Sequence, residues 1–396
     1  MRILSLQHLF PLPLDSGGKI KSYHTLRALA GRHEVRAVAY VRTDNEAGLL
    51  PDIQRICPVE AVRLTRSRAR QCGDLLGSIV TGRSFIVERD FRAEMRSAVR
   101  DAVRGFKPDV VHVDHLQMTQ FVEFGGTYRV VLDNHNVESM IVERVAQTSS
   151  SPIMRAYASL EWPKLRRYEL DVCGRCDMVL VVSDEDKANL AHLRPTLSNL
   201  ECVPIGVDVH HYQPVTRVKD SHNILSVGTM YWPPNVDSML YFVQDVLPLV
   251  RREMPDCTLT IAGQRPVEAI QALSREPGIT VTGYVNDDRD VARDCGVFVV
   301  PLRSGSGVRV KILNALAMGL PVVSTSIGAE GLDVVNGEHL MIADTPQAFA
   351  GAVVQVLRDR DLSHALGANG RKLVCAKYSW ERVGERLLAL FDRFQT

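Results

Sequence analysis

Several features are missing or scarce in this sequence of 396 residues, and each absence excludes a class of protein. No apolar run approaches the roughly 20 residues that a membrane-spanning helix needs. The opening MRILSLQHLFPL lacks an apolar segment closed by a small-residue cleavage site, so it is unlike a secretory signal. The net charge is only +1, from 47 Lys and Arg against 46 Asp and Glu, and so gives no indication of nucleic-acid binding.

Cysteine is also sparse, with eight residues scattered along a long chain. This usage predicts reduced thiols in a cytosol rather than a disulfide framework. Cys173 and Cys176 form a single Cys-x-x-Cys pair with no second pair at metal-binding spacing, so a helical coincidence is favoured over zinc. His112, Asp114 and His115 are a still weaker metal candidate. We expect a cytoplasmic protein, with peripheral contact at the inner face of a membrane left open.

Composition and pattern together predict two α/β domains. The length exceeds what one ordinary core accommodates, and 45% hydrophobic with 23% charged residues is a globular composition. Short apolar, β-branched runs alternate with longer amphipathic stretches, and runs such as VFVVP are apolar throughout, which is typical of parallel strands covered on both faces. We expect six strands in each half: Arg2–Gln7, His33–Val41, Asp109–Val113, Tyr128–Asp133, Asp177–Ser183 and Glu201–Pro204, then Asn223–Gly228, Cys257–Gly263, Ile279–Gly283, Gly296–Pro301, Pro321–Thr325 and Leu340–Ile342.

Two connecting segments have recognisable signals. Asp208–His222 is polar and contains a proline, so it is the expected inter-domain linker. After Pro233 and Pro234, Asn235 is expected to be the N-cap of a helix whose apolar positions keep a 3.6-residue period as far as Pro255.

One segment departs from the even charge balance. From Ala61 to Lys107, eleven Arg and Lys stand against five Asp and Glu. Such a segment is compatible with a surface for an anionic membrane or a phosphate-bearing acceptor, and also with an ordinary solvated helix face. The solvated face is the favoured alternative, and both stay open.

The segment from Val300 to Glu330, VPLRSGSGVRVKILNALAMGLPVVSTSIGAE, has the strongest functional signal. A strand runs into a Gly-Ser-Gly turn and then into a helix rich in Leu, Ala and Met. A glycine-rich turn before a helix exposes backbone N–H groups, and the helix dipole favours an anion there. The carboxyl end of a strand is also where α/β sheets bind ligands. The segment therefore predicts an anion site.

Arg309 and Lys311 add two positive charges to this turn. Residues two apart on one continuous helix point to opposite sides. For both to hold one diphosphate, Arg309 must lie in the turn and Lys311 in the first helical turn, where Lys311 shares a face with Asn314. A surface Arg/Lys pair on an ordinary loop is the structural alternative.

Two positions in the first half suit ligand binding. Gly17 and Gly18 follow a proline-containing loop and open a helix, so the backbone can approach a ligand closely, although a plain tight turn is the alternative. His135 stands just past the carboxyl end of an apolar strand. A neutral imidazole there can hydrogen-bond a hydroxyl group, and a structural histidine in a loop is the alternative.

These motifs resemble those of the retaining glycosyltransferases of family 4. That family typically has a Glu-Gly-Phe-Gly turn followed by Leu-Glu-Ala-Met-Ala-x-Gly-x-Pro-Val-Val, and this chain has Ser306-Gly307-Val308 and then LNALAMGLPVV. Six further stretches are similar and span nearly the whole chain: DSGGKIKSYHTLRALAGRHEV, DNHNVES, SDEDKANL, PIGVDVHHY, VGTMYWPPNVDSM and YSWERVGERLLALF. The resemblance implies the α/β GT-B fold, two doubly wound Rossmann-like domains facing each other across a cleft.

The resemblance also implies a domain organisation and a reaction. Residues 1–209 would bind the acceptor, residues 210–375 the nucleotide sugar, and the last helix, 376–396, would cross back to the first domain. The enzyme would move a sugar from a nucleoside-diphosphate sugar to an acceptor hydroxyl of a glycan, glycolipid or small-molecule aglycone. The anomeric configuration would be retained. Neither a cofactor nor a metal ion is expected, and no nucleic-acid partner.

By the same resemblance, each candidate residue has an expected role. The catalytic residues would be His135, Arg309 and Lys311. Donor-binding residues would be Gly17, Gly18, Gly228, Tyr284, Ser306, Gly307, Val308, Asn314 and Glu330. Acceptor-binding residues would be His115, Asn134 and Asn136.

The sequence departs from the family pattern in two ways. The two family glutamates fall on Ser306 and Asn314, and the family's Arg and Lys after the first strand of the second domain are absent from GTMYW. Arg309 and Lys311 resemble a subgroup in which the cationic clamp lies on the donor-site helix. A catalytically silent GT-B protein that binds a nucleotide or a partner enzyme, and a GT-B nucleotide-sugar epimerase, remain alternatives. A dehydrogenase is disfavoured, because no Gly-x-Gly-x-x-Gly follows the first strand.

Overall fold

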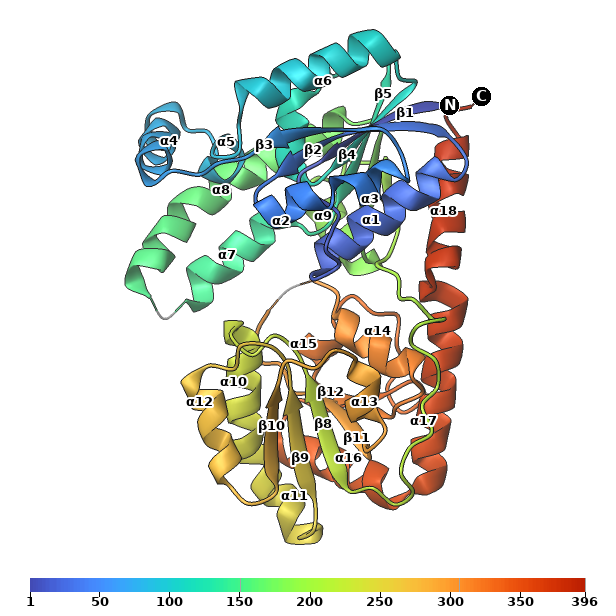
Figure 1. The fold of residues 1–396 in the computed structure, drawn as a ribbon. Helices are drawn as coiled ribbons and strands as arrows, with labels where there is room; N and C mark the ends of the chain where they lie inside the picture. Colours follow the sequence, from blue (N-terminus) through green and yellow to red (C-terminus); the bar gives the residue numbers. More distant parts are fainter. Residues whose placement is uncertain (150, 306, 396) are drawn as a thin grey trace. The chain divides into compact units, whose positions relative to one another are not determined.

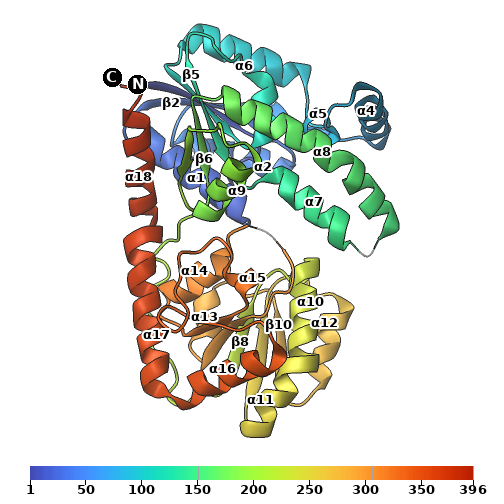
Figure 2. The ribbon, with the colours of Figure 1, turned by 180° about the vertical axis from the view of Figure 1, so that it is seen from behind.

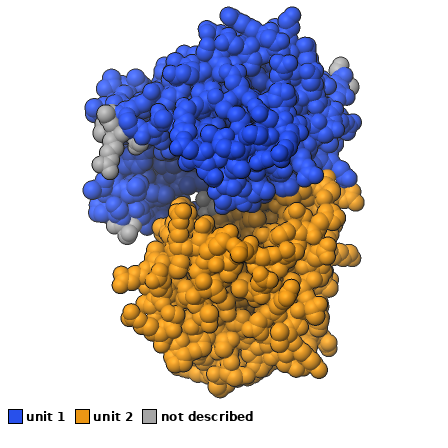
Figure 3. All heavy atoms as spheres, in the orientation of Figure 1, with its two compact units in different colours: residues 1–204, 383–396 blue, residues 205–382 orange. Residues whose placement is uncertain are grey.

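The computed structural model describes residues 1–149, 151–305 and 307–395, and the chain forms two units, which Figure 3 distinguishes by colour. Unit 1 comprises Met1–Pro204 and Val383–Thr396, and unit 2 comprises Ile205–Arg382. The boundary therefore follows Pro204 rather than residue 209, and the last residues of the chain return to unit 1. No helix among the described residues is both long and apolar enough to cross a membrane.

Unit 1 is built on a seven-stranded parallel sheet in the order β3-β2-β1-β4-β5-β6-β7 (Figure 1). Six of these strands were expected from the sequence, and β3 was missed. Because β3 is an edge strand with most of its side chains exposed, it lacks the continuous apolar run that marks its neighbours. The strands are β1 (Arg2–Gln7), β2 (Glu34–Val41), β3 (Val59–Arg63), β4 (Val110–Asp114), β5 (Arg129–Asn134), β6 (Met178–Val181) and β7 (Leu200–Cys202).

Helices cover both faces of this sheet (Figures 1 and 2). On one face α6 packs its buried Met95 and Val99 into the main core of the unit. On the other face α1 and α18 lie together, and a Cβ on Gly384 would lie 3.4 Å from Ala28. The helices are α1 (Gly17–Ala30), α2 (Asp44–Gly48), α3 (Leu50–Gln54), α4 (Arg68–Thr81), α5 (Phe85–Glu88), α6 (Ala93–Phe106), the 3₁₀ helix η1 (Leu116–Phe121), α7 (Glu138–Thr148), α8 (Pro152–Arg175), α9 (Asp184–Leu193) and α18 (Trp380–Asp392).

Unit 2 has a six-stranded parallel sheet in the order β10-β9-β8-β11-β12-β13. Successive strand residues enter different cores, as Ile224 and Leu225 of β8 do, so both faces are covered and the unit is doubly wound. All six expected strands are present: β8 (Asn223–Val227), β9 (Thr258–Ala262), β10 (Ile279–Gly283), β11 (Val297–Val300), β12 (Val322–Ser324) and β13 (Met341–Ile342).

One helix of unit 2 corrects a prediction. Helix α10 begins at Pro233 with Trp232 as its N-cap, so Asn235 is the third helical residue and not the cap. Proline is well suited to the first helical turn, since its missing N–H has no partner there. The other helices are α11 (Leu247–Glu253), α12 (Glu268–Ala272), α13 (Asp288–Ala292), α14 (Val310–Ala317), α15 (Ser326–Ala329), α16 (Pro346–Arg358), α17 (Arg360–Leu373), the 3₁₀ helix η3 (Leu273–Arg275) and the π-helices η2 (Phe242–Val246) and η4 (Val374–Tyr378).

Candidate functional site

In each sheet there is a point at which the strand order reverses, between β1 and β4 in unit 1 and between β8 and β11 in unit 2. In open parallel sheets, ligands bind outside the carboxyl ends of the strands at such a point. Most of the residues singled out from the sequence gather at these two places.

In unit 2 the turn after β8 is held very tightly. The N–H of Gly228 donates to the carbonyl of Ala262 at 3.0 Å. A Cβ on Gly263, whose φ is +151°, would lie 1.6 Å from the carbonyl oxygen of Gly228, so this approach requires glycine. A Cβ on Gly228 would lie 3.1 Å from Asn235 Nδ2 and 3.2 Å from Lys311 Nζ. The backbone at Gly228 therefore packs directly against these two polar side chains.

The turn after β11 places the two cations as their spacing predicted. Arg309 is the N-cap of α14, and Lys311 is the second residue of that helix. Gly305 and Gly307 have φ values of +129° and +78°, which side chains other than glycine rarely adopt. Arg309 Nη1 donates to the carbonyl of Gly307 at 2.6 Å. Ser306 lies outside the described residues.

Lys311 is half-buried, and its Nζ donates to Asn235 Oδ1 at 2.9 Å. Burial and the neighbouring Arg309 lower the pKa of Lys311 to about 7. We call Gly228, Asn235, Arg309 and Lys311 the cation cluster. Sequence reasoning missed the contribution of Asn235, because a local pattern cannot reveal a partner in a helix far along the chain.

The remaining donor-site candidates lie at different places. Val308 is half-buried in the turn before α14, and Asn314 is half-buried on α14, one helical turn after Lys311. Glu330 is the C-cap of α15, which follows β12. Tyr284 follows the edge strand β10 and is 70% exposed, so it is not part of the cation cluster.

In unit 1, Asp114 at the end of β4 connects two imidazoles. Asp114 Oδ1 accepts a hydrogen bond from His135 Nε2 at 2.9 Å, and Asp114 Oδ2 lies 3.0 Å from His115 Nδ1. The two rings are 3.8 Å apart between centroids. We call Asp114, His115 and His135, all of them buried, the imidazole cluster. The start of α1 lies against it, since a Cβ on Gly18 would be 3.5 Å from His115 Nε2 and 3.8 Å from His135 Nδ1. Gly17 is the first residue of α1.

The protonation of this cluster follows from burial and from Asp114. Burial and the charge of His115 lower the pKa of His135 to about 4, so His135 is neutral at neutral pH. Burial also disfavours the charge of His115, but Asp114 outweighs it and raises the pKa of His115. Although burial opposes it, the two imidazoles hold the pKa of Asp114 well below its usual range. Since His135 Nε2–H donates to Asp114, its Nδ1 can accept a hydrogen bond.

Other buried polar side chains lie next to the imidazole cluster. Lys21 of α1 pairs with Asp133 of β5, and both side chains are completely buried. Although burial opposes ionisation, Lys21 lowers the pKa of Asp133. Ser22 Oγ donates to Asp114 Oδ2 at 2.9 Å. Sequence reasoning missed these contacts, which join segments about a hundred residues apart.

The loop that holds His135 is fixed by Glu169 of α8, which sequence reasoning also missed. Glu169 Oε1 accepts from Asn134 Nδ2 at 3.1 Å and from the backbone N–H of Glu138 at 2.9 Å. Glu169 Oε2 accepts from the N–H and the hydroxyl of Ser139. The carboxylate thereby caps α7, whose own N-cap makes no side-chain bond. Asn134, an acceptor-site candidate, is thus engaged structurally, and Asn136 is half-buried beside it.

The imidazole cluster is also a candidate metal site. One ligand atom from each member of the imidazole cluster lies within 4.8 Å of the others, so this is the place where the described residues could hold a metal ion. The ring nitrogens that face Asp114 already hydrogen-bond to it.

Burial and Glu169 raise the pKa of Glu138 to about 7, which suits a proton acceptor at neutral pH. Cys173 and Cys176 are buried free thiols.

Two family models match the chain, one in each unit. Residues 22–211 match the family described as "Glycosyltransferase Family 4", and residues 221–359 match "Glycosyl transferases group 1". Together they match well over half of the chain.

The chain is a glycosyltransferase of the group 1, family 4 type.

Relatives of this glycosyltransferase include one that matches along nearly its whole length. The "Uncharacterized 44.6 kDa protein in cps region" of Klebsiella pneumoniae is 23% identical over 94% of this chain and 95% of its own. A "GDP-mannose-dependent alpha-(1-6)-phosphatidylinositol monomannoside mannosyltransferase" of Mycobacterium tuberculosis is 27% identical over 53% of this chain and 60% of its own. The match thus spans less than two thirds of that enzyme.

Solved structures confirm the GT-B fold of the glycosyltransferase. Anabaena Alr3699/HepE in complex with UDP has a TM-score of 0.69 and 12% identity, covering 99% of this chain and all of its own. Sucrose-phosphate synthase from Thermosynechococcus elongatus has a TM-score of 0.69 and 16% identity, covering 99% of each chain. At such identities the likeness concerns the fold alone.

The basic segment of this glycosyltransferase is largely engaged in contacts of its own. Arg66 pairs with the buried Asp90, and Arg63 pairs with Asp44. Arg92 is buried and donates to the backbone carbonyls of residues 65, 89 and 91. These contacts favour structural roles for many of the arginines over a free basic surface.

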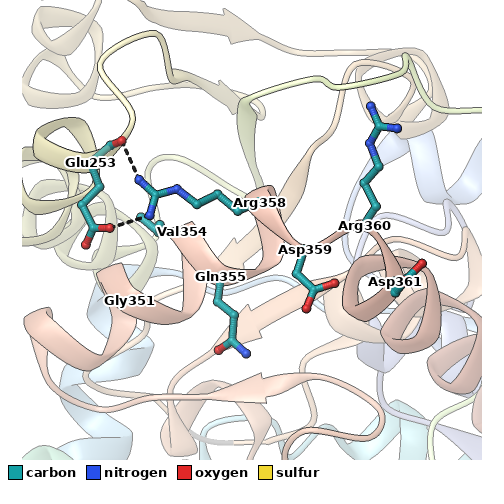
Figure 4. A pocket seen from close by; sticks show the side chains of 8 residues that line it. All are labelled: Glu253, Gly351, Val354, Gln355, Arg358, Asp359, Arg360 and Asp361. Carbon is teal, nitrogen blue, oxygen red and sulfur yellow. Dashed lines mark hydrogen bonds and ion pairs between the residues drawn. The ribbon is translucent and has the colours of Figure 1, made fainter.

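A shallow hollow on unit 2, shown in Figure 4, lies away from the cation cluster. Arg358 donates to the carboxylate and to the backbone carbonyl of Glu253, each at 2.8 Å. Glu253 precedes β9, so the hollow is near the amino ends of the strands, the edge opposite to the cation cluster. We assign no ligand to it.

Proposed function

We propose that this glycosyltransferase moves a sugar from a nucleoside-diphosphate sugar to an acceptor hydroxyl, with retention of configuration and without a metal ion. The observation that carries the proposal is the cation cluster, where Arg309 and Lys311 meet the N-terminus of α14 at the reversal point of the sheet. Relatives named as mannosyltransferases and as a capsular polysaccharide glycosyltransferase support a glycan or glycolipid acceptor.

The chemistry requires stabilisation of a leaving diphosphate. As the bond between the sugar and the diphosphate loosens, negative charge grows on the phosphate oxygens. In this proposal Arg309, Lys311 and the backbone N–H groups at the start of α14 stabilise it, and the two side-chain cations supply the positive charge that a metal ion would otherwise provide. The acceptor hydroxyl attacks from the side of the leaving group, and a diphosphate oxygen takes its proton. His135 Nδ1 accepts a hydrogen bond from a sugar hydroxyl.

A ligand panel followed by a turnover assay tests this proposal. Uridine, guanosine, adenosine and thymidine diphosphates and their sugar conjugates are compared by thermal shift, since a ligand that binds only the folded protein raises its stability. We expect one base to stabilise the protein most. The matching nucleotide sugar should then give a product of retained configuration only when an acceptor is added. Binding without turnover on any acceptor would favour the silent nucleotide-binding protein, and a changed sugar without acceptor would favour the epimerase.

We further propose that unit 1 contacts a membrane peripherally through exposed apolar side chains of α4 and of the first half of α8. Val80 and Ile153 are 86% and 84% exposed, and Leu76, Ile79 and Leu160 are exposed beside them in sequence. Lys164 Nζ donates to the carbonyl of Ser78 at 3.0 Å and ties the two helices together. Large exposed apolar side chains on a helix suit the headgroup boundary of a bilayer.

Sedimentation with vesicles tests the membrane contact. We expect wild-type protein to sediment with vesicles of phosphatidylcholine and phosphatidylglycerol. An Ile79→Asp, Val80→Asp variant should stay in the supernatant while keeping its thermal stability. Equal sedimentation of this variant and the wild type would overturn the assignment of α4.

A further inference from the structure

The side chain of Asn235 connects three segments of unit 2. It lies in the first turn of α10 and is only 9% exposed. Its Nδ2 donates to the carbonyl of Thr229 at 3.1 Å, in the turn after β8, and its Oδ1 accepts from Lys311 Nζ at 2.9 Å, on α14. An ammonium only donates and a carbonyl only accepts, so both contacts fix the same orientation of the amide. We propose that Asn235 is the positioning residue of the donor site, holding the Lys311 ammonium toward the diphosphate.

This inference rests on the proposed function, and the identity of the residue supports it. A neutral amide can orient an ammonium without cancelling its charge, whereas a carboxylate in the same place would form an ion pair and compete with the phosphate. Among the described residues, Asn235 accepts from one of the three N–H donors of Lys311, and the other two are left for phosphate oxygens. Gly228 packs against both groups, so they have little room to rearrange.

The charges around Lys311 explain why it needs a fixed partner. Among the described residues, Arg309 is the charged group that acts on Lys311, and it has the same sign. The nearby carboxylate of α10, Asp237, is engaged by Arg303 of the turn after β11. With burial added, the pKa of Lys311 falls to about 7, so part of the free protein carries an uncharged Lys311 at neutral pH. Among the described residues, Asn235 is the hydrogen-bond partner that holds the Lys311 ammonium in its orientation.

A consequence is that the diphosphate binds together with a proton. A bound diphosphate adds negative charge and raises the pKa of Lys311 above about 7, so the complex holds a proton that the free protein partly lacks. Lys311 therefore supports full affinity below its pKa in the free protein, down to about pH 6, where the terminal phosphate itself takes up a proton. Affinity falls about tenfold per pH unit above pH 7, until the pKa of the complex is reached.

Calorimetry of UDP or GDP, whichever stabilises the protein more, tests the proposal. Titrations at pH 7.5 in two buffers of different ionisation enthalpy report the proton uptake, and affinities from pH 6 to 9 give the profile. We expect proton uptake with wild type. We expect about tenfold weaker binding with Asn235→Ala, the scale of one lost hydrogen bond to a charged group. With Asn235→Asp, the new carboxylate keeps Lys311 protonated, so binding weakens and both the uptake and the slope above pH 7 disappear.

Ser238→Ala is the matched control. The Ser238 hydroxyl is buried in the same helix and donates to the carbonyl of Asn235 at 2.8 Å, so its loss disturbs α10 without touching Lys311. We expect this variant to lose thermal stability but to keep the wild-type affinity and proton uptake. If Asn235→Ala and Asn235→Asp behave like Ser238→Ala, Asn235 is merely structural and the positioning role is overturned. If no nucleoside diphosphate binds the wild type, the proposed function fails first and this inference falls with it.

Discussion

The two reversal points differ in how their charges are balanced. In unit 1, Asp133 is paired with Lys21, and Asp114 is shared by two imidazoles, so the buried charges are compensated within the protein. In unit 2, Arg309 and Lys311 lie together, and the charge that acts on Lys311 has its own sign. The first arrangement is complete in itself, whereas the charge of Lys311 would be balanced by a bound anion. The five predictions below test this contrast, from the largest expected effect to the smallest.

Removing a buried charge in unit 1 should have the largest effect on stability. Asp133→Asn leaves Lys21 buried and uncompensated, so we expect about 3–5 kcal/mol less free energy of unfolding. Urea denaturation measures it. A Lys21→Met, Asp133→Leu variant removes both charges and should recover most of the loss. If the single variant is as stable as wild type, the pair does not hold unit 1 together.

Removing the cations of unit 2 should reverse the pattern, with a large effect on catalysis and a small one on stability. Arg309→Ala and Lys311→Ala should each reduce transition-state stabilisation by about 2–4 kcal/mol, the scale of losing one preorganised donor. We expect kcat/KM to fall accordingly and the melting temperature to change little. Wild-type turnover by the double variant would contradict the role of both residues.

Acid should destabilise unit 1 selectively. The pKa values of His8 and His135 are lowered to about 4, while an unfolded histidine has a pKa of about 6.5, so the unfolded chain binds more protons between these values. Stability should therefore fall below pH 6.5 by about 1.4 kcal/mol per pH unit for each histidine, but Glu138, whose pKa is raised to about 7, gains a proton in the folded protein over the same range and offsets the slope of one of them. Since the pKa of His115 is raised, its contribution is complete below pH 6.5 and adds no slope there. Urea denaturation at several pH values measures the slope, and a flat profile from pH 6.5 to 5 would refute this account.

Exchanging Asn314 should change donor affinity modestly. In the proposed donor site it makes one neutral hydrogen bond to the ribose, so Asn314→Glu should strengthen binding by about 1 kcal/mol through a charge-assisted contact. Asn314→Leu should weaken binding, because ribose hydroxyls would be buried without partners. Calorimetry with the best nucleoside diphosphate compares the three proteins. Identical affinities would remove Asn314 from the donor site.

The smallest expected effect is that of metal removal. The cations of unit 2 supply the positive charge for the leaving group, so excess EDTA should leave turnover unchanged. If EDTA abolishes activity and Mn²⁺ or Zn²⁺ restores it, the imidazole cluster is the place to search for the ion.

The sequence predicted much of the fold, because buried parallel strands are apolar along their whole length. It missed β3, an edge strand whose exposed side chains break that pattern. It also predicted Asn235 as a helix cap, because Asn near a helix start usually caps it. Helix α10 instead begins at Pro233, two residues before Asn235. The side-chain amide of Asn235 contacts Lys311, which is 76 residues away in the sequence.

The same distinction between local sequence patterns and long-range contacts applies to the candidate sites. The positions of Arg309 and Lys311 followed from their spacing and from the geometry of one turn, which are local properties. The partners of His135 and of its loop, Asp114 and Glu169, come from β4 and α8 and are brought there by the sheet and by helix packing. Local patterns thus locate a functional segment, while its supporting contacts depend on the completed fold.

The return of the last helix to unit 1 has a consequence for how the protein is made. Leu387, Leu390 and Phe391 of α18 are buried in unit 1, and Gly384 lies against Ala28 of α1. During synthesis residues 205–382, which make up unit 2, leave the ribosome before residues 383–396, the last part of unit 1. The nascent unit 1 therefore exposes an apolar face while unit 2 is being completed, a period in which chaperones matter most. A chain that stops before Val383 lacks these buried residues and leaves unit 1 incomplete.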